Sequence, residues 1–146
     1  MSRVWVISAT PERTAQALVL IQSIVKHSSG EVQLINPMIN APPRKSITEL
    51  VVLSRLTRAL EYLNNGVDEV IVLGADNFFY SDPMEIGHTY AGREALFVPH
   101  CQEWLPAPHD QNRSLIRAGV INSDLHVWRN TPKVRSFLEI IIKEID

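Results

Sequence analysis

Four apolar residues in a row, followed at once by small and polar ones, limit the folds open to this chain. Val70-Ile71-Val72-Leu73 contains no polar residue, and such a run predicts a strand buried on both faces of a sheet. Gly74-Ala75-Asp76-Asn77 follows it directly. Open α/β sheets bind ligands beyond the carboxyl ends of buried strands, so Asp76 is a candidate ligand-binding carboxylate. Starting a turn is the alternative role for Asp76.

A strand, a helix and a second strand are expected before this run. Residues 4–7 are apolar throughout, and Thr10-Pro11-Glu12 supplies the capping hydroxyl, proline and acid that typically begin a helix. Ser28-Ser29-Gly30 is expected to end that helix, and residues 31–36 form the second strand. Strands connected through a helix are usually parallel, with a right-handed crossover. The amino-terminal part therefore indicates an α/β fold.

The rest of the chain adds helices and strands of the same kind. Ser46-Ile47-Thr48-Glu49 fits a capping box at the start of a helix. Residues 95–98 form a strand, and residues 119–128 form either a strand pair or one bent strand. Thr131-Pro132 begins a closing amphipathic helix. Residues 101–117 form a long irregular segment, and such loops often serve function.

Composition and length bound the class of protein. The chain of 146 residues has 45% hydrophobic and 21% charged residues, which predicts one soluble globular domain over residues 1–146. A net charge of −2 argues against broad binding to nucleic acid or membranes. The single cysteine, Cys101, excludes an internal disulfide. No signal peptide or membrane span is evident, so a cytoplasmic protein is expected, and an exposed sheet edge would favour a homo-oligomer.

Several motifs of common enzyme classes are absent. The chain has no G-x-G-x-x-G, no P-loop, no H-E-x-x-H and no G-x-S-x-G. Their absence disfavours dinucleotide oxidoreductases, P-loop NTPases, zincins and α/β-hydrolases. His100, Cys101 and His109 have no diagnostic spacing, so we interpret them as loop residues rather than metal ligands or a nucleophile.

Several segments, taken in order, resemble one enzyme family. VDEVIVLGADNFFYSDP (residues 67–83) resembles the strand and Asp-x-Asp motif of the GT-A nucleotide-diphospho-sugar glycosyltransferases. A strand ending in Pro-His, a proline-and-aspartate loop and Gly-Val-x-Asn are typical of one bacterial branch. This chain has the matching segments Val98-Pro99-His100, Pro106-Ala107-Pro108-His109-Asp110 and Gly119-Val120-Ile121-Asn122. Val127-Trp128-Arg129-Asn130-Thr131-Pro132, with Phe137-Leu138, resembles the strand and closing helix of the same branch.

The resemblance implies a fold, a donor and a site. The fold is a GT-A-like (Rossmann-like) three-layer α/β domain with a mixed, mostly parallel sheet flanked by helices. The activity is transfer of a hexosyl or pentosyl group from a nucleotide-diphosphate sugar to an unidentified acceptor. The positions that match the family's donor-binding residues are Ser8, Ala9, Thr10, Arg13, Arg55, Ala75, Asp76, Asn77 and Asn122.

A metal ion and a catalytic base are also implied. Asp76 matches the second aspartate of the motif and is the expected ligand of Mg²⁺ or Mn²⁺. Gly74 replaces the first aspartate, so metal binding is expected to be weak, completed from elsewhere or dispensable. An inverting enzyme needs a carboxylate base, for which Asp110 and Asp124 are the candidates. Either the segment 101–117 or a partner subunit would bind the acceptor.

Three alternatives remain open. Gly74 also fits a non-catalytic nucleotide- or sugar-binding module of the same fold. A sugar-nucleotide nucleotidyltransferase ranks lower, because no glycine-rich basic loop follows the first strand. A polymer acceptor such as DNA or polysaccharide would require a basic path on one face, for which the candidates are Arg113, Arg117, Arg129, Lys133 and Arg135.

Overall fold

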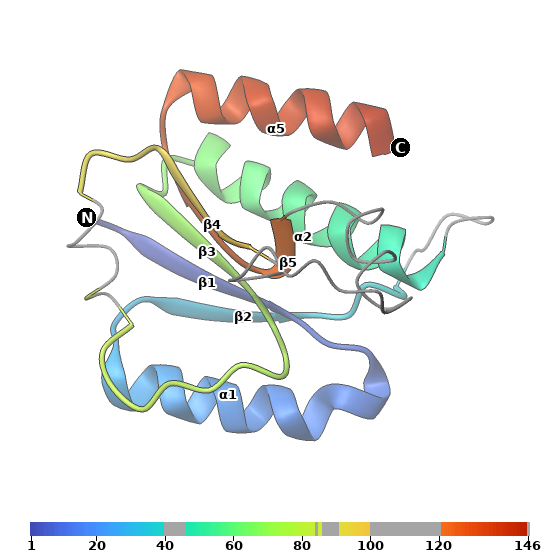
Figure 1. Ribbon diagram of the computed structural model, residues 1–146, viewed down its shortest axis with the longest axis vertical. Helices are drawn as coiled ribbons and strands as arrows, with labels where there is room; N and C mark the ends of the chain where they lie inside the picture. The colour runs from blue at the N-terminus through green and yellow to red at the C-terminus, as the bar shows by residue number, and fades with distance from the viewer. Residues whose placement is uncertain (40–45, 84, 86–90, 100–120, 146) are drawn as a thin grey trace, which may run out of the picture.

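A single five-stranded sheet organises the chain (Figure 1). The computed structural model describes residues 1–39, 46–83, 85, 91–99 and 121–145, with the backbone alone at 98, 99 and 121–124. The strands, in chain order, are β1 (Arg3–Ser8), β2 (Glu31–Ile35), β3 (Glu69–Gly74), β4 (Ala95–Pro99) and β5 (Ile121–Arg129). The helices are η1 (Pro11–Arg13, a 3₁₀ turn), α1 (Thr14–His27), α2 (Ile47–Asn64) and α5 (Pro132–Ile145).

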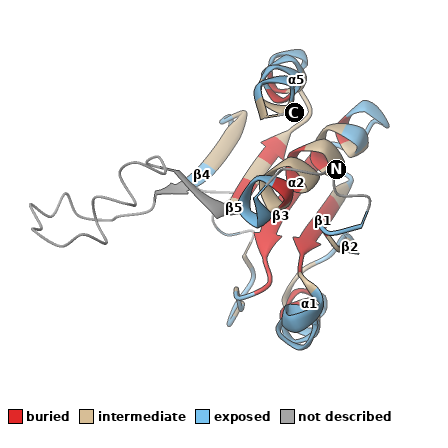
Figure 2. Cartoon of the chain, turned by 90° about the vertical axis from the view of Figure 1, so that its right-hand side faces the viewer, coloured by how far each residue is buried: buried red, intermediate tan, exposed pale blue. Residues whose placement is uncertain are grey.

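The strand order β2-β1-β3-β5-β4 confirms the mixed, mostly parallel sheet. β1 lies between β2 and β3 and is parallel to both, whereas β5 is antiparallel to its neighbours β3 and β4. Helix α1 covers one face of the sheet, and α2 and α5 cover the other (Figure 2). The three-layer α/β architecture expected from the sequence is therefore confirmed.

The apolar runs of β1 and β3 are buried on both faces, as their sequences predict. Residues 70, 71, 72 and 73 are at most 3% exposed. Val70 and Val72 pack with α2 and α5, whereas Ile71 and Leu73 pack with α1. This division follows from the alternation of side chains along a strand, and it places one hydrophobic cluster on each side of the sheet.

The predicted capping box at the start of α2 is present. The Ser46 hydroxyl accepts a hydrogen bond from the Glu49 backbone N–H, and the Glu49 carboxylate accepts one from the Ser46 backbone N–H. Thr131 likewise caps α5, because its hydroxyl accepts a hydrogen bond from the Val134 N–H at 3.2 Å.

Residues 121–129 form one strand rather than a pair of strands. The structure does not describe the segment 101–117, which includes Cys101 and His109, and it does not describe His100.

A buried carboxylate joins three strands at the amino end of β3. Glu69 is fully buried and stands directly beside Arg3 of β1 and Arg129 of β5 in the strand register. Its two oxygens accept from Arg3 Nε at 2.8 Å and from Arg129 Nε at 3.3 Å. The two guanidinium groups compensate the cost of burying this charge. The cluster is at the opposite end of β3 from Asp76.

Candidate functional site

The candidate site lies where the chain changes the direction in which it adds strands to the sheet. From β1 the chain passes through α1 to β2 on one side, and from β2 through α2 to β3 on the other side of β1. The carboxyl ends of β1 and β3 therefore flank a topological switch point, the usual ligand-binding crevice of an open α/β sheet. Figure 1 shows that β1 ends, and α1 and α2 begin, on the same side of the molecule.

A pocket of about 250 Å³ occupies this crevice. We call it the switch-point pocket. Its described lining comes from the end of β1, from η1, from the first turns of α2 and from the end of β3: Ser8, Ala9, Thr10, Arg13, Ile47, Val51, Arg55, Gly74, Ala75 and Asp76. Seven of the nine residues expected to bind a donor are in this set, so the structure brings most of the predicted site together. Their binding role stays a prediction.

Arg55 crosses from α2 to the end of β1. The residue is 4% exposed, and its Nε donates a hydrogen bond to the Ser8 hydroxyl at 2.5 Å. A guanidinium is planar and permanently charged, so this bond fixes the plane in which its other donors lie. Arg55 thus brings a buried, oriented cation to the switch-point pocket.

Arg13 and Asp76 are neighbours in the lining of the pocket. Arg13 Nη1 and Asp76 Oδ2 are 3.8 Å apart, and both side chains are slightly more than half exposed. An exposed pair at this separation contributes little to stability. Both groups are therefore available to a ligand at small cost.

Asn77 takes part in the turn after β3, and its expected role in binding the donor stays a prediction. Its Nδ2 donates to the Gly74 carbonyl oxygen at 2.9 Å, and the residue is not among the described lining of the pocket. The next segment is held against α1, because the Phe79 N–H donates to the Ser23 hydroxyl at 3.3 Å. The Phe79 ring also packs edge-on against Trp5. These contacts fix the backbone on both sides of Asp76, which lines the pocket.

Thr10 does not cap a helix with its side chain, contrary to the sequence prediction. Its backbone is extended before η1, but its side chain makes no capping hydrogen bond. The hydroxyl instead bonds to Glu12, and this bond lowers the pKa of the Glu12 carboxyl.

The described residues do not fit a divalent-metal site. Nowhere in the part of the chain that the structure describes do three His, Cys, Asp or Glu side chains gather as metal ligands. In the pocket's described lining, Asp76 is the one carboxylate, and the ionisable residues beside it are Arg13 and Arg55. The position of the first motif aspartate is Gly74, whose carbonyl oxygen is bonded to Asn77. A Mg²⁺ or Mn²⁺ ion would require several oxygen ligands.

The remaining site predictions concern residues whose side chains are not described. Asp110 lies outside the described residues, and Asn122 and Asp124 are described by backbone alone. β5 is antiparallel to β3 and begins beside the carboxyl end of β3, since Leu125 is the register partner of Leu73. The backbone therefore brings positions 122 and 124 to the end of the sheet that holds the pocket. Their roles as donor ligand and catalytic base stay predictions.

Three residues of the expected polymer path have local partners away from the pocket. Arg129 binds Glu69 at the far end of β3. Lys133 pairs with Glu94 at 3.2 Å, and Arg135 donates to the Asn130 side chain. Arg113 and Arg117 lie outside the described residues. These placements give no support to a basic path leading from the switch-point pocket.

Ile47 and Val51 also line the pocket and were not singled out from the sequence, whereas Gly74 was noted there as the replacement of the first motif aspartate. The capping box at Ser46 is the signal that could have found the first two residues. It fixes the start of α2, and a helix that connects two parallel strands begins near the carboxyl end of the sheet. Residues 47, 51 and 55 are spaced by four and share one face, so the position of Arg55 implies theirs.

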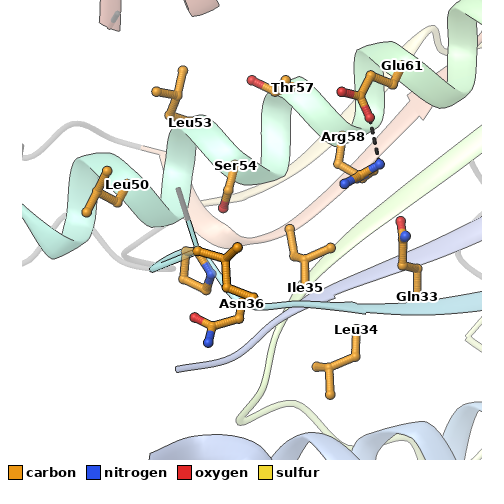
Figure 3. Close-up of a pocket in the computed structure, with 12 residues that line it drawn as sticks. Gln33, Leu34, Ile35, Asn36, Leu50, Leu53, Ser54, Thr57, Arg58 and Glu61 are labelled. Carbon is orange, nitrogen blue, oxygen red and sulfur yellow. Dashed lines mark ion pairs between the residues drawn. The ribbon is translucent and has the colours of Figure 1, made fainter. Parts of the chain in front are cut away.

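A second groove of about 410 Å³ runs between β2 and α2 (Figure 3). We call it the β2–α2 groove. Leu50 and the Arg58–Glu61 ion pair lie at its opposite ends. That pair is closed at 2.8 Å, so the charge of Arg58 is already compensated. The groove is larger than the switch-point pocket but less suited to an anionic ligand.

Comparison with solved structures identifies the fold. The chain superposes on a glycosyltransferase involved in the glycosylation of the major capsid of PBCV-1 with a TM-score of 0.62 at 10% identity. It superposes on the apo-form glycosyltransferase GlyE of Streptococcus pneumoniae TIGR4 with a TM-score of 0.54 at 14% identity. These alignments cover 98% and 99% of this chain, which spans 66% and 39% of the respective neighbours.

Sequence comparison adds no closer relationship. No protein-family model matches the chain, and no curated protein matches it. Among the described residues, no helix has the length and apolar character needed to cross a membrane. The structural likeness is to glycosyltransferases over nearly the whole chain, and it confirms the GT-A-like α/β fold expected from the sequence. The chain has a glycosyltransferase fold.

Proposed function

We propose that the chain transfers a glycosyl group from a nucleotide-diphosphate sugar to an acceptor. The observation that carries the proposal is the convergence of the predicted donor-binding residues on the switch-point pocket. Two arginines bring positive charge to that pocket, and a nucleotide diphosphate is an anion. The fold, shared with glycosyltransferases, supports the same conclusion independently of the pocket.

The proposed reaction exchanges one bond at the anomeric carbon of the sugar. The bond from this carbon to a diphosphate oxygen breaks, and a bond from an acceptor oxygen forms. The acceptor's proton passes to a carboxylate, for which Asp110 and Asp124 remain the candidates. Negative charge grows on the departing diphosphate, and preorganised cations at that point stabilise the transition state. Arg13 and Arg55 are placed to supply them.

A non-catalytic nucleotide- or sugar-binding module is the second candidate. The observation in its favour is Gly74, which leaves the family's motif with one carboxylate. The two candidates differ in turnover rather than in binding. Release of nucleoside diphosphate from a bound nucleotide sugar, with water or an added acceptor, is expected only of a transferase. A polymer acceptor is a further proposal. The positions of Arg129, Lys133 and Arg135 do not support it, because their partners lie away from the pocket.

Calorimetric titration with UDP- and GDP-sugars tests the proposed donor site. We expect one of them to bind with a Kd between about 1 µM and 1 mM, the range typical of enzyme substrates. A bulky side chain in the pocket, Val51→Trp, is expected to abolish that binding. Leu53→Trp, which places the same bulk in the β2–α2 groove, serves as the matched control and should change Kd by less than about threefold. Absence of binding by the unmodified chain would refute the proposal.

A further inference from the structure

We infer that the switch-point pocket neutralises the donor's diphosphate with the guanidinium groups of Arg13 and Arg55 and requires no divalent cation. The inference rests on the proposed function and specifies how its donor is held. The resemblance to the GT-A glycosyltransferases implies a metal ion at this position. The residues of this chain indicate that arginine side chains, rather than a metal ion, neutralise the diphosphate.

The charges in the described lining favour an anion over a cation. Of its ten residues, Arg13 and Arg55 are cationic and Asp76 is anionic, which leaves an excess of positive charge. A divalent cation placed beside Asp76 would lie close to the Arg13 guanidinium, which is 3.8 Å from the carboxylate. Like charges at such distances repel. A phosphate group would instead be attracted to the same guanidinium.

The backbone at the motif offers no compensation for the missing carboxylate. Gly74 stands next to Ser8 in the strand register, and both residues line the pocket. Its carbonyl oxygen already accepts the Asn77 side-chain amide at 2.9 Å. Further oxygen ligands for a metal ion would therefore have to come from residues other than the described lining.

The two arginines are suited to a diphosphate by position and by burial. Arg55 is buried and oriented by Ser8, and electrostatic attraction is stronger where water is excluded. Arg13 is more than half exposed, so it can adjust to a ligand. The guanidinium fork bonds phosphate oxygens in a bidentate manner. One fixed and one adjustable cation, carried on α2 and η1, thus border the pocket together.

Replacement of Asp76 distinguishes the two modes of neutralisation by the sign of its effect. If Asp76 holds a metal ion that bridges to the phosphates, Asp76→Asn weakens nucleotide binding. If the arginines bind the diphosphate directly, Asp76→Asn removes a repulsive charge and releases Arg13. We then expect binding to tighten by about two- to fivefold, the effect of one exposed charge pair.

The experiment is a titration of the full chain with UDP, GDP and inorganic pyrophosphate, in EDTA and in Mn²⁺. We expect UDP or GDP to bind with Kd values that agree within about threefold in the two buffers. Arg13→Gln should weaken that binding by about three- to tenfold in both buffers, and Asp76→Asn should tighten it in EDTA. Pyrophosphate should compete for the same site.

Two results would overturn the inference, and they are distinguishable. Binding in Mn²⁺ that is lost in EDTA, together with loss of binding in Asp76→Asn, would establish a metal-bridged donor and leave the proposed function intact. No binding of UDP, GDP or any nucleotide sugar in either buffer would overturn both the inference and the proposed function. Thermal unfolding of each variant, compared with the unmodified chain, verifies that a loss of binding is not a loss of fold.

Discussion

Replacing Glu69 with Gln is expected to lower the free energy of unfolding by about 3 kcal/mol. The Glu69 carboxylate is fully buried between Arg3 and Arg129, with one oxygen bonded to each. A neutral amide leaves two largely buried guanidinium groups, 16% and 21% exposed at their side chains, without their shared anion. Removal of one partner from a buried ion cluster costs far more than the cluster itself contributes. Urea unfolding followed by circular dichroism measures the change.

Glu61→Gln is the matched control for this prediction. Glu61 also pairs with an arginine, Arg58, but both side chains are more than 40% exposed. The pair lies on the surface of α2, where the expected loss is below about 1 kcal/mol. Equal losses in the two variants would contradict a structural role for the buried cluster. Because Glu69 is remote from the switch-point pocket, folded Glu69→Gln should keep its nucleotide affinity.

Replacing Arg55 with Met is expected to weaken nucleotide binding by about thirtyfold, which corresponds to about 2 kcal/mol. Met has a similar length and fills the space of the side chain, but it lacks charge and donors. The loss should be large because Arg55 is 4% exposed and fixed by Ser8, so its attraction to a diphosphate is little screened. Calorimetry with the nucleotide that binds the unmodified chain measures the effect.

Two further variants make the Arg55 result specific. Arg55→Lys keeps the charge but loses the planar fork, so its affinity should fall between those of Arg55→Met and the unmodified chain. Arg58→Met removes an arginine from the same helix, but from the β2–α2 groove and from an ion pair with Glu61. Its affinity should change by less than about twofold. Comparable losses in Arg55→Met and Arg58→Met would indicate only a general effect of net charge.

The sheet and its helices could be predicted from local patterns. The run Val70-Ile71-Val72-Leu73 is too short for a typical helix and has no polar face, so burial on both sides of a sheet was its expected position. The start of α2 followed from Ser46 and Glu49, because a capping box satisfies backbone groups within four residues. In these cases the physical cause lies within the segment itself.

The partner that each polar side chain finds could not be predicted from the sequence, whether that partner lies in the same turn or in a distant segment. Thr10 had the pattern of a helix cap, but its hydroxyl bonds to the Glu12 side chain instead. Asn77 follows the motif aspartate directly, and the bond from its side-chain amide to the Gly74 carbonyl oxygen was not expected. Arg129 matched a basic path until its partner Glu69, sixty residues away, was known. Each outcome depends on which neighbours the fold supplies, and a local pattern does not contain that information.

The most direct test of the switch-point pocket as the donor site is an amide chemical-shift map of the ¹⁵N-labelled chain during titration with UDP and GDP. We expect shifts concentrated in the segments 8–13, 47–55 and 74–76, which hold the described lining of the pocket. Residues 33–36 and 57–61, along the β2–α2 groove, should change little. Shifts confined to that groove, or no shifts with either nucleotide, would contradict the assignment of the donor site to the carboxyl ends of β1 and β3.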